Sequence, residues 1–229
     1  MTARPGYHPA VLDAIVAAFG PGRCLDLGAG TGIATQALVE RGVDVVAVEP
    51  LEAMRARLHE ALPDVEALKG RGEAIPLATR SVASVLCAQT FHWFDHAPTL
   101  DEIVRIARPR AMMATLWNVR DEQVSWMAAY TQVVDRYAGD TPRYRTMRWR
   151  EAIERDARFS LVDELRMPNP QASNPDHVVA RALSTSFIAG LNEAEQRSVE
   201  SEIRAIVGPL GDEFDFLYET EAQIWSVEG

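Results

Sequence analysis

Apolar positions along the chain recur with two different periods, and segments of the two kinds alternate. Apolar residues spaced three and four apart indicate amphipathic helices, whereas short runs rich in valine and leucine indicate buried strands. We expect helices at residues 9–19, 33–40, 54–61, 95–107, 121–137, 175–189 and 192–207. We expect strands at residues 24–27, 43–48, 65–69, 81–87, 110–117, 159–167 and 214–227. Strands that alternate with helices predict an α/β fold with a doubly wound, mostly parallel sheet, and we expect its last strand to be antiparallel.

The length of 229 residues fits a single domain with added covering segments. We interpret residues 1–20 as a lead-in, and residues of about 138–158 and 168–210 as cap or insert elements. Apolar residues make up 47% of the chain, enough for a full core. The sequence has no run of eighteen apolar residues, the length that a membrane-spanning helix needs. No signal segment opens the chain, and Cys24 and Cys87 both fall in expected core strands, where buried free thiols are typical. We therefore expect a cytoplasmic protein without a membrane partner.

The chain is acidic, with a formal net charge of −10 at pH 7. Binding of nucleic acid phosphates relies on Lys and Arg, so this charge argues against a nucleic acid partner and favours a small molecule. Basic residues concentrate only at residues 143–150, where Arg145 and Arg148 are candidates to bind an anionic substrate, because guanidinium groups match carboxylates. The alternative is a solvated helical face, which is the usual meaning of a charge run. No pattern in the sequence specifies an oligomeric state.

A glycine-rich turn joins the first expected strand to the helix at 33–40, with Gly28, Gly30 and Gly32 at alternate positions. Such a turn lets backbone approach a ligand closely, because a side chain would block the approach or forbid the positive φ angles. The dinucleotide fingerprint would need glycine where Ile33 stands, and a phosphate-binding P-loop would need a lysine that this turn lacks. Glu49 ends the next strand, where its carboxylate can accept two hydrogen bonds from ribose hydroxyls.

The Asp-x-Gly-x-Gly-x-Gly pattern resembles the first motif of class I methyltransferases that depend on S-adenosylmethionine (SAM). The resemblance implies a Rossmann-like, doubly wound sheet of seven strands, mostly parallel with an antiparallel last strand, and with helices on both faces. It also implies that SAM is held by the residues of the glycine turn and of the second strand end, namely Asp26, Gly28, Ala29, Gly30, Gly32, Glu49, Pro50 and Met54. Pro50, Leu51 and Met54 would flank the adenine ring, although Met54 could instead face the core.

Two further segments resemble parts of the same family. Residues 70–76 are similar to a Gly-Asp-Ala-Glu-x-Leu-Pro loop that addresses the adenine amino group, but Arg71 stands at the Asp position. The expected adenine contact is therefore from the backbone of Gly72 or Glu73. The lead-in Arg4-Pro-Gly-Tyr7 resembles a segment that folds over the methionine end of SAM, where Arg4 and Tyr7 could contact its carboxylate. The alternative is a frayed terminus.

Three aromatic residues and a histidine follow the fourth expected strand, in Gln89-Thr-Phe-His-Trp-Phe-Asp95. This loop resembles that of the type 11 methyltransferases, in the subgroup that contains trans-aconitate methyltransferase. Gln89 is then a cofactor candidate, and Phe91 and Trp93 are expected to line the SAM or substrate pocket unless they pack in the core. His92 could act as a general base or anchor the loop. A metal site of His92 with Asp95 and His96 would lack further ligands nearby, so we expect none.

These features together predict an enzyme that transfers a methyl group from SAM to a small-molecule acceptor and releases S-adenosylhomocysteine. An oxygen acceptor, in a carboxylate or a phenol, is favoured. One alternative is a SAM-binding protein that carries out no methyl transfer and acts as a regulator or in another reaction. A nucleotide-dependent oxidoreductase is the other alternative, and Ile33 disfavours it.

Overall fold

The computed structural model describes residues 5–139, 141, 142 and 144–228, which form two compact units. Of the described residues, those within 6–117, 142–167 and 220–228 form the sheet unit, and Pro5 with those within 118–141 and 168–219 forms the helical unit. Each unit has its own core and is described by itself.

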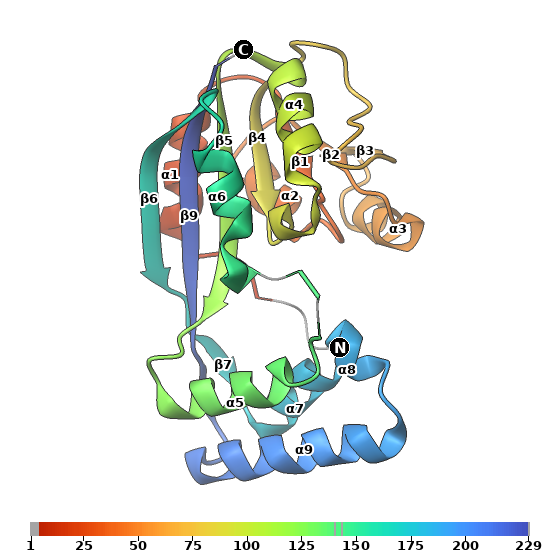
Figure 1. Ribbon diagram of the computed structural model, residues 1–229, viewed down its shortest axis with the longest axis vertical. Helices are drawn as coiled ribbons and strands as arrows, with labels where there is room; N and C mark the ends of the chain where they lie inside the picture. The colour runs from red at the N-terminus through yellow and green to blue at the C-terminus, as the bar shows by residue number, and fades with distance from the viewer. Residues whose placement is uncertain (1–4, 140, 143, 229) are drawn as a thin grey trace. The chain divides into compact units, whose positions relative to one another are not determined.

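The sheet unit is built on a seven-stranded sheet (Figure 1). In spatial order its strands are β3 (Glu66–Leu68), β2 (Val45–Val48), β1 (Cys24–Leu27), β4 (Val82–Ala88), β5 (Ala107–Arg120), β9 (Tyr218–Val227) and β6 (Phe159–Pro168). β1 pairs in parallel with β2 and with β4, and the parallel ladder extends to β3 on one side and β5 on the other. The sheet is mixed, mostly parallel with an antiparallel strand, which confirms the predicted fold class.

Helices cover the sheet unit on both faces (Figure 1). α1 (Pro9–Phe19) and α2 (Ile33–Val39) pack their apolar sides on one face of the sheet, and α4 (His96–Ile106) and α6 (Arg148–Glu154) lie on the other. α3 (Glu52–Ala61) follows β2 and buries Leu58. Burying a side chain of this kind is worth about 1.5–3 kcal/mol, so these faces hold the unit together. None of the described helices is both long enough and apolar enough to cross a bilayer.

The helical unit has a separate apolar core. It contains α5 (Ser125–Asp135), α7 (Pro175–Leu183), α8 (Ser186–Ala189), α9 (Glu193–Val207) and the two-stranded sheet of β7 (Gln171–Ser173) and β8 (Phe214–Phe216). α9 packs against α5 and α7, and its start is fixed by a capping box between Asn192 and Glu195. The apolar sides of these helices meet around Phe216.

Two elements that the sequence predicted as continuous are split in the structure, each for a local reason. The single helix expected at 175–189 is split, because the hydroxyls of Ser184 and Thr185 donate to the Arg181 carbonyl and compete with the helical ladder. The single strand expected at 214–227 is also split, because residues 214–216 pair antiparallel with the short β7. Asp95 occupies the N-cap position of α4, but its side chain forms no capping bond.

A buried carboxyl group lies in the central strand. Asp26 of β1 is fully buried, and its Oδ2 accepts a hydrogen bond of 2.6 Å from the Thr35 hydroxyl. Its other oxygen, Oδ1, has no partner among the described residues. Burial, opposed by the Thr35 bond and reinforced by the Glu49 charge, raises the pKa of Asp26 from 3.8 to about 6. The ionised carboxylate therefore destabilises the fold at neutral pH.

Replacing this carboxyl should change how stability depends on pH. The folded state binds the proton of Asp26 more tightly than the unfolded state does. The contribution of Asp26 to the free energy of unfolding is therefore most favourable below about pH 4 and decreases as the pH rises to about 6. At about 1.4 kcal/mol per pH unit, the cost at neutral pH is roughly 3 kcal/mol. We expect Asp26→Asn to have a higher free energy of unfolding than wild type in urea at pH 7. Near pH 4 this difference should disappear. Asp44→Asn, at an exposed position just before β2, is the control. A difference between Asp26→Asn and wild type that stays constant from pH 4 to 7 would contradict the assignment.

Candidate functional site

The register of the parallel strands brings the predicted motifs to one edge of the sheet. Leu27 pairs with Val48, and the amides of Gly28 and Ala29 donate to the Val48 carbonyl at 2.7 and 3.2 Å. On the other side of β1, the amide of Gln89 donates to the Leu116 carbonyl at 2.8 Å, at the end of the β4–β5 ladder. The glycine turn, Glu49 and the loop after β4 therefore lie at the carboxyl ends of neighbouring strands, where ligands bind in open α/β sheets.

The three glycines of the turn have different surroundings. All have positive φ, at +74° for Gly28, +58° for Gly30 and +89° for Gly32. A Cβ at Gly28 would overlap the Thr90 hydroxyl, and a Cβ at Gly32 would come within 3.0 Å of the Leu58 side chain. A Cβ at Gly30 would meet nothing within 4 Å. Gly28 and Gly32 are thus required for packing, whereas Gly30 presents bare backbone to open space.

The carboxylate of Glu49 lies against this bare backbone. Its Oε2 accepts from the Gly30 amide at 3.0 Å, and its Oε1 accepts from the Leu51 amide at 3.0 Å. A carboxylate has about four lone-pair sites. Each oxygen of Glu49 can therefore still accept a further hydrogen bond, as two neighbouring hydroxyls of a sugar would require.

Apolar side chains next to Glu49 are exposed. Leu51 is 59% and Met54 38% exposed, and Pro50 is half-buried. Met54 therefore does not face the core, which was the alternative left open by the sequence. Large exposed apolar residues beside a carboxylate and a bare turn are typical of a surface that contacts a flat apolar ring.

The loop at residues 70–76 is held to α4. A Cβ on the buried Gly72 would come within 3.0 Å of both Phe94 and Thr99, so packing explains this glycine. The Glu73 carboxylate accepts the Asp95 amide at 2.9 Å and so fixes the start of α4. Arg71, at the position of the family Asp, is exposed.

The aromatic loop divides between core and surface. Gln89 has φ +59°, a conformation that costs free energy in a residue with a side chain and is common at functional sites. Phe91 is fully buried, and its ring stacks on that of His96 with 5.6 Å between the centroids. It therefore packs in the core, which was the alternative to lining the pocket. Trp93, two residues later, is 53% exposed. The His92 ring contacts both Trp93, at 4.9 Å between centroids, and Trp117, at 5.1 Å.

Sequence reasoning missed an aromatic cluster that continues from His92. Trp117 near the end of β5 contacts Tyr144 and Trp149, with centroids 5.0 and 5.2 Å apart. The Tyr144 hydroxyl donates to Glu221 of β9, which also pairs with Arg166 at 2.9 Å. The Trp117 indole N–H is buried and has no partner within the described part of the chain. Only the aromatic residues at 144 and 149 signalled this cluster in the sequence, because its members come from four separate segments.

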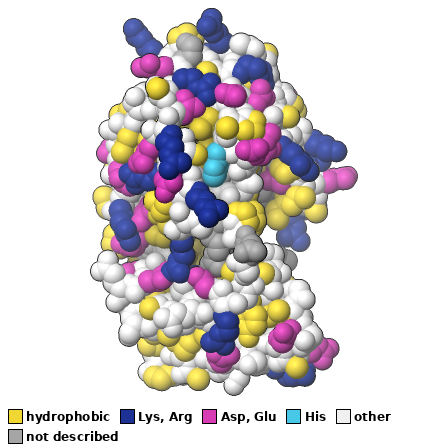
Figure 2. All heavy atoms as spheres, in the orientation of Figure 1, with side chains coloured by type: hydrophobic (Ala, Val, Ile, Leu, Met, Phe, Trp, Pro, Cys, Tyr) yellow, Lys and Arg dark blue, Asp and Glu magenta, His cyan; other side chains and the backbone are white. Residues whose placement is uncertain are grey.

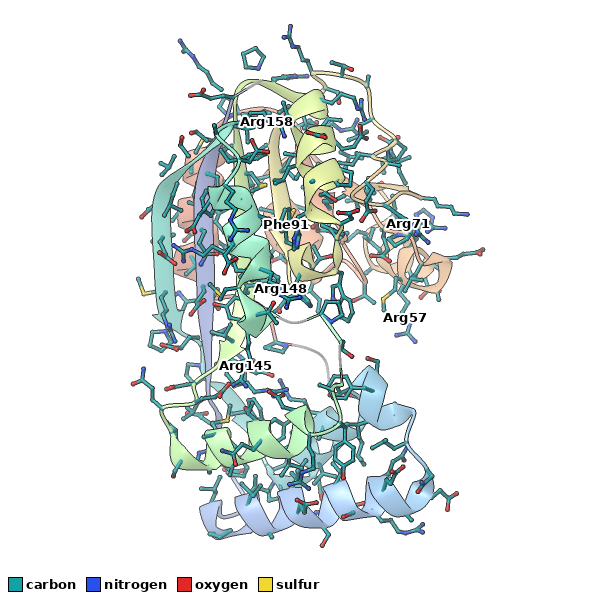
Figure 3. All side chains as sticks on the ribbon, viewed as in Figure 1. Arg57, Arg71, Phe91, Arg145, Arg148 and Arg158 are labelled. Carbon is teal, nitrogen blue, oxygen red and sulfur yellow. The ribbon has the colours of Figure 1, made fainter. Side chains whose placement is uncertain are left out.

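The predicted substrate arginines lie at the same end of the sheet unit. Figure 3 places Arg148 at the start of α6, at the end where the strands finish, and Arg158 at the opposite end. Arg145 and Arg148 are exposed, and Arg148 forms no ion pair with any described residue. Arg150 instead pairs with Glu154 and Glu164, as a solvated helical face would.

The two residues predicted in the lead-in have separate outcomes. Tyr7 packs against the apolar cluster of α1 and the sheet. Arg4 lies outside the described residues.

A cavity of about 490 Å³ lies elsewhere on the sheet unit, between α4 and α6. It is lined by His96, Leu100, Ala152, Arg155 and Arg158 among others, and none of the predicted site residues lines it. Arg158 pairs with Asp101 and Asp156 at 2.7 and 2.6 Å, so its charge is balanced within the cavity wall. Figure 2 likewise shows acidic and basic side chains interspersed over this face. The edge at Gly30 and Glu49 remains the better candidate site.

Comparison with known proteins identifies the family of this chain. The sequence model of a protein family described as "Methyltransferase domain" matches residues 25–115, the segment from β1 to β5. An uncharacterised methyltransferase of Mycobacterium tuberculosis is 45% identical over 142 residues, and the match spans 62% of this chain but only 58% of that relative. An uncharacterised methyltransferase-like protein of Schizosaccharomyces pombe is 30% identical, with 96% of this chain and 89% of that protein covered.

Solved structures share the fold at low sequence identity. A protein of Anaeromyxobacter dehalogenans, named as a candidate type II methyltransferase, is 23% identical with a TM-score of 0.69, covering 99% of this chain and 98% of that one. The YcgJ protein of Bacillus subtilis is 13% identical with a TM-score of 0.62, covering 97% of this chain and 100% of that one. These likenesses show the fold, and the near full-length match in Schizosaccharomyces pombe shows the family. The chain belongs to the class I methyltransferase family.

Proposed function

We propose that this protein transfers a methyl group from SAM to a small-molecule acceptor, with oxygen of a carboxylate or a phenol favoured, and releases S-adenosylhomocysteine. The family fold implies SAM as the methyl donor. One observation carries the proposal: Gly30 leaves its backbone bare beside a carboxylate, Glu49, that still has free lone pairs. That pair matches a ligand with a neighbouring diol, as in a nucleoside.

The residues at the sheet edge fit SAM. Glu49 would accept the two ribose hydroxyls, and the exposed Leu51 and Met54 with Pro50 would flank the adenine ring. The backbone of the turn would lie along the aminoacyl part, with the orphaned Oδ1 of Asp26 below it as an acceptor. Gly72 and Glu73 are more distant candidates, because their packing and hydrogen bond already account for them.

The chemistry itself is largely supplied by SAM, whose sulfonium activates the methyl group. The task left to the protein is to align the acceptor with that methyl and to exclude water, which can contribute several kcal/mol. Trp93 offers an exposed aromatic surface for the acceptor, and Arg148 offers a cation that has no carboxylate partner among the described residues. A carboxylate acceptor, as in the small-acid subgroup that the aromatic loop resembles, needs no general base. A phenol would gain from one, and His92 is then the first candidate.

Loss of the Glu49 carboxylate or of the bare backbone should weaken SAM binding. A hydrogen bond to a charged group contributes about 1.5–3 kcal/mol, so Glu49→Gln should lower SAM affinity about tenfold or more in titration calorimetry. Gly30→Ala places a methyl group on the open surface and should have a similar effect. Gly42→Ala is the matched control, because Gly42 also has positive φ, +77°, and also faces open space, but lies in the turn after α2.

The control separates backbone strain from loss of the ligand. Gly42→Ala should share the stability cost of Gly30→Ala while retaining wild-type SAM affinity. The proposed function fails if wild type binds neither SAM nor S-adenosylhomocysteine. It also fails if Glu49→Gln and Gly30→Ala bind SAM as wild type does.

Replacing Trp93 should lower the kcat/KM for the acceptor and leave the fold intact. A screen with methyl-labelled SAM, weighted toward small carboxylic acids and phenols, identifies the acceptor first. With that acceptor, we expect Trp93→Ala to lower kcat/KM about tenfold or more, since aromatic contacts to a ligand are lost. The free energy of unfolding should change by less than about 1 kcal/mol, because the side chain is 53% exposed. Leu161→Ala, at an exposed apolar residue of β6, should change neither quantity. An equal acceptor kcat/KM for Trp93→Ala and wild type would remove Trp93 from the site.

A further inference from the structure

The helical unit contains a half-buried arginine that has no carboxylate partner in the described part of the chain. The guanidinium of Arg181 on α7 lies 4.8 Å from the ring centroid of Phe216 and 5.3 Å from that of Tyr218. Its Nη1 donates to the Tyr218 hydroxyl at 2.7 Å, yet it forms no ion pair with any described residue. Other arginines of this unit are paired: Arg136 with Glu202, Arg197 with Glu193 and Arg204 with Asp176. Arg181 therefore brings an unbalanced positive charge into a partly apolar setting.

Two side chains that contact the Phe216 ring, those of Arg181 and Tyr130, each have a buried polar atom without a partner among the described residues. The Nε of Arg181 and the hydroxyl of Tyr130 are both buried, and neither has a hydrogen-bond partner among the described residues. The Tyr130 side chain is fully buried, and its ring meets that of Phe216 edge to face at 5.2 Å. Leaving such a group unsatisfied costs about 1–3 kcal/mol, and two of them on side chains that contact the same ring call for a common explanation.

The free groups of this cluster are hydrogen-bond donors. The Tyr218 hydroxyl accepts from Arg181, so its own proton is available to a second partner. Burial raises the pKa of Tyr130 to about 12, so this hydroxyl keeps its proton at neutral pH. A site that offers N–H and O–H groups around a guanidinium selects an anion with acceptor oxygens.

The charge balance indicates which anion fits. Arg120, at the end of β5, lies over the Tyr130 ring at 4.9 Å, but it pairs with Asp135 at 3.9 Å. One net positive charge, that of Arg181, is thus left in the cluster. A singly charged, planar carboxylate matches this charge and the fork of the guanidinium better than a phosphate dianion does.

We propose that Arg181, Tyr218 and Tyr130 form a carboxylate-binding site within the helical unit. The bound group accepts from Nε of Arg181 and from the two tyrosine hydroxyls, which satisfies the orphaned donors. The site stands on contacts inside one unit and is independent of methyl transfer.

The test follows the arginine side-chain Nε–H resonances of the full chain by NMR during titration with benzoate, acetate, inorganic phosphate and the neutral benzamide at constant ionic strength. We expect a saturable shift of one resonance with benzoate or acetate, absent with benzamide and absent in Arg181→Gln. Tyr218→Phe and Tyr130→Phe keep the rings and the packing, and each should weaken carboxylate binding about tenfold. Arg197→Gln, at an exposed paired arginine, is the matched control and should bind as wild type.

Stability separates a binding role from a structural one. Tyr130→Phe removes an unsatisfied buried hydroxyl, so the ligand-free variant should be at least as stable as wild type while its carboxylate affinity falls. The site is overturned if neither carboxylate produces a saturable shift, or if both Phe variants bind like wild type. Phosphate binding tighter than benzoate by tenfold would overturn the assignment to a carboxylate. SAM affinity, measured on the same variants, should stay unchanged, so the outcome is separate from that of the proposed function.

Discussion

Parallel pairing of β1 with β2 on one side and β4 on the other is the constraint on which the candidate site depends. Parallel neighbouring strands end at the same edge of the sheet. The glycine turn, Glu49 and the loop after β4 are therefore brought together by the strand pairing itself. The Val48 carbonyl extends the ladder into the turn by accepting from Gly28 and Ala29. The turn is therefore held as firmly as the sheet, which is the condition for a preorganised ligand surface.

The glycine turn combines packing and binding in one short segment. Gly28 lets Thr90 approach, Gly32 lets Leu58 approach, and Gly30 alone is left open. Directly before the turn, Asp26 keeps a buried carboxyl whose charge costs stability. Strongly perturbed carboxyl groups of this kind cluster at functional sites, and a stability cost retained there is consistent with a binding role.

Local patterns were sufficient to predict the strands of the large sheet, the helices α1 to α4, the glycine turn and the place of Glu49 at a strand end, because each depends on spacing along the chain. No helix was expected at α6. Packing between distant segments was not predictable in this way. Gly72 is explained by Phe94 and Thr99, and Phe91 is buried against His96, contacts that no periodicity reveals. The cluster of Trp117 with Tyr144 and Trp149 joins β5 to a segment about 30 residues later. The break at Ser184 arises from hydroxyls that compete with the helix, which helical periodicity does not register.

The opposite burial of Phe91 and Trp93 has a consequence for how this protein can diverge. The first ring anchors the segment after β4 in the core, so the path of the main chain does not depend on the identity of the second. Under the proposed function, in which Trp93 contacts the acceptor, position 93 is thereby free to vary under selection for a new compound while the scaffold stays intact. A lineage could exchange its chemical target by substitutions there without first acquiring compensating changes in the interior.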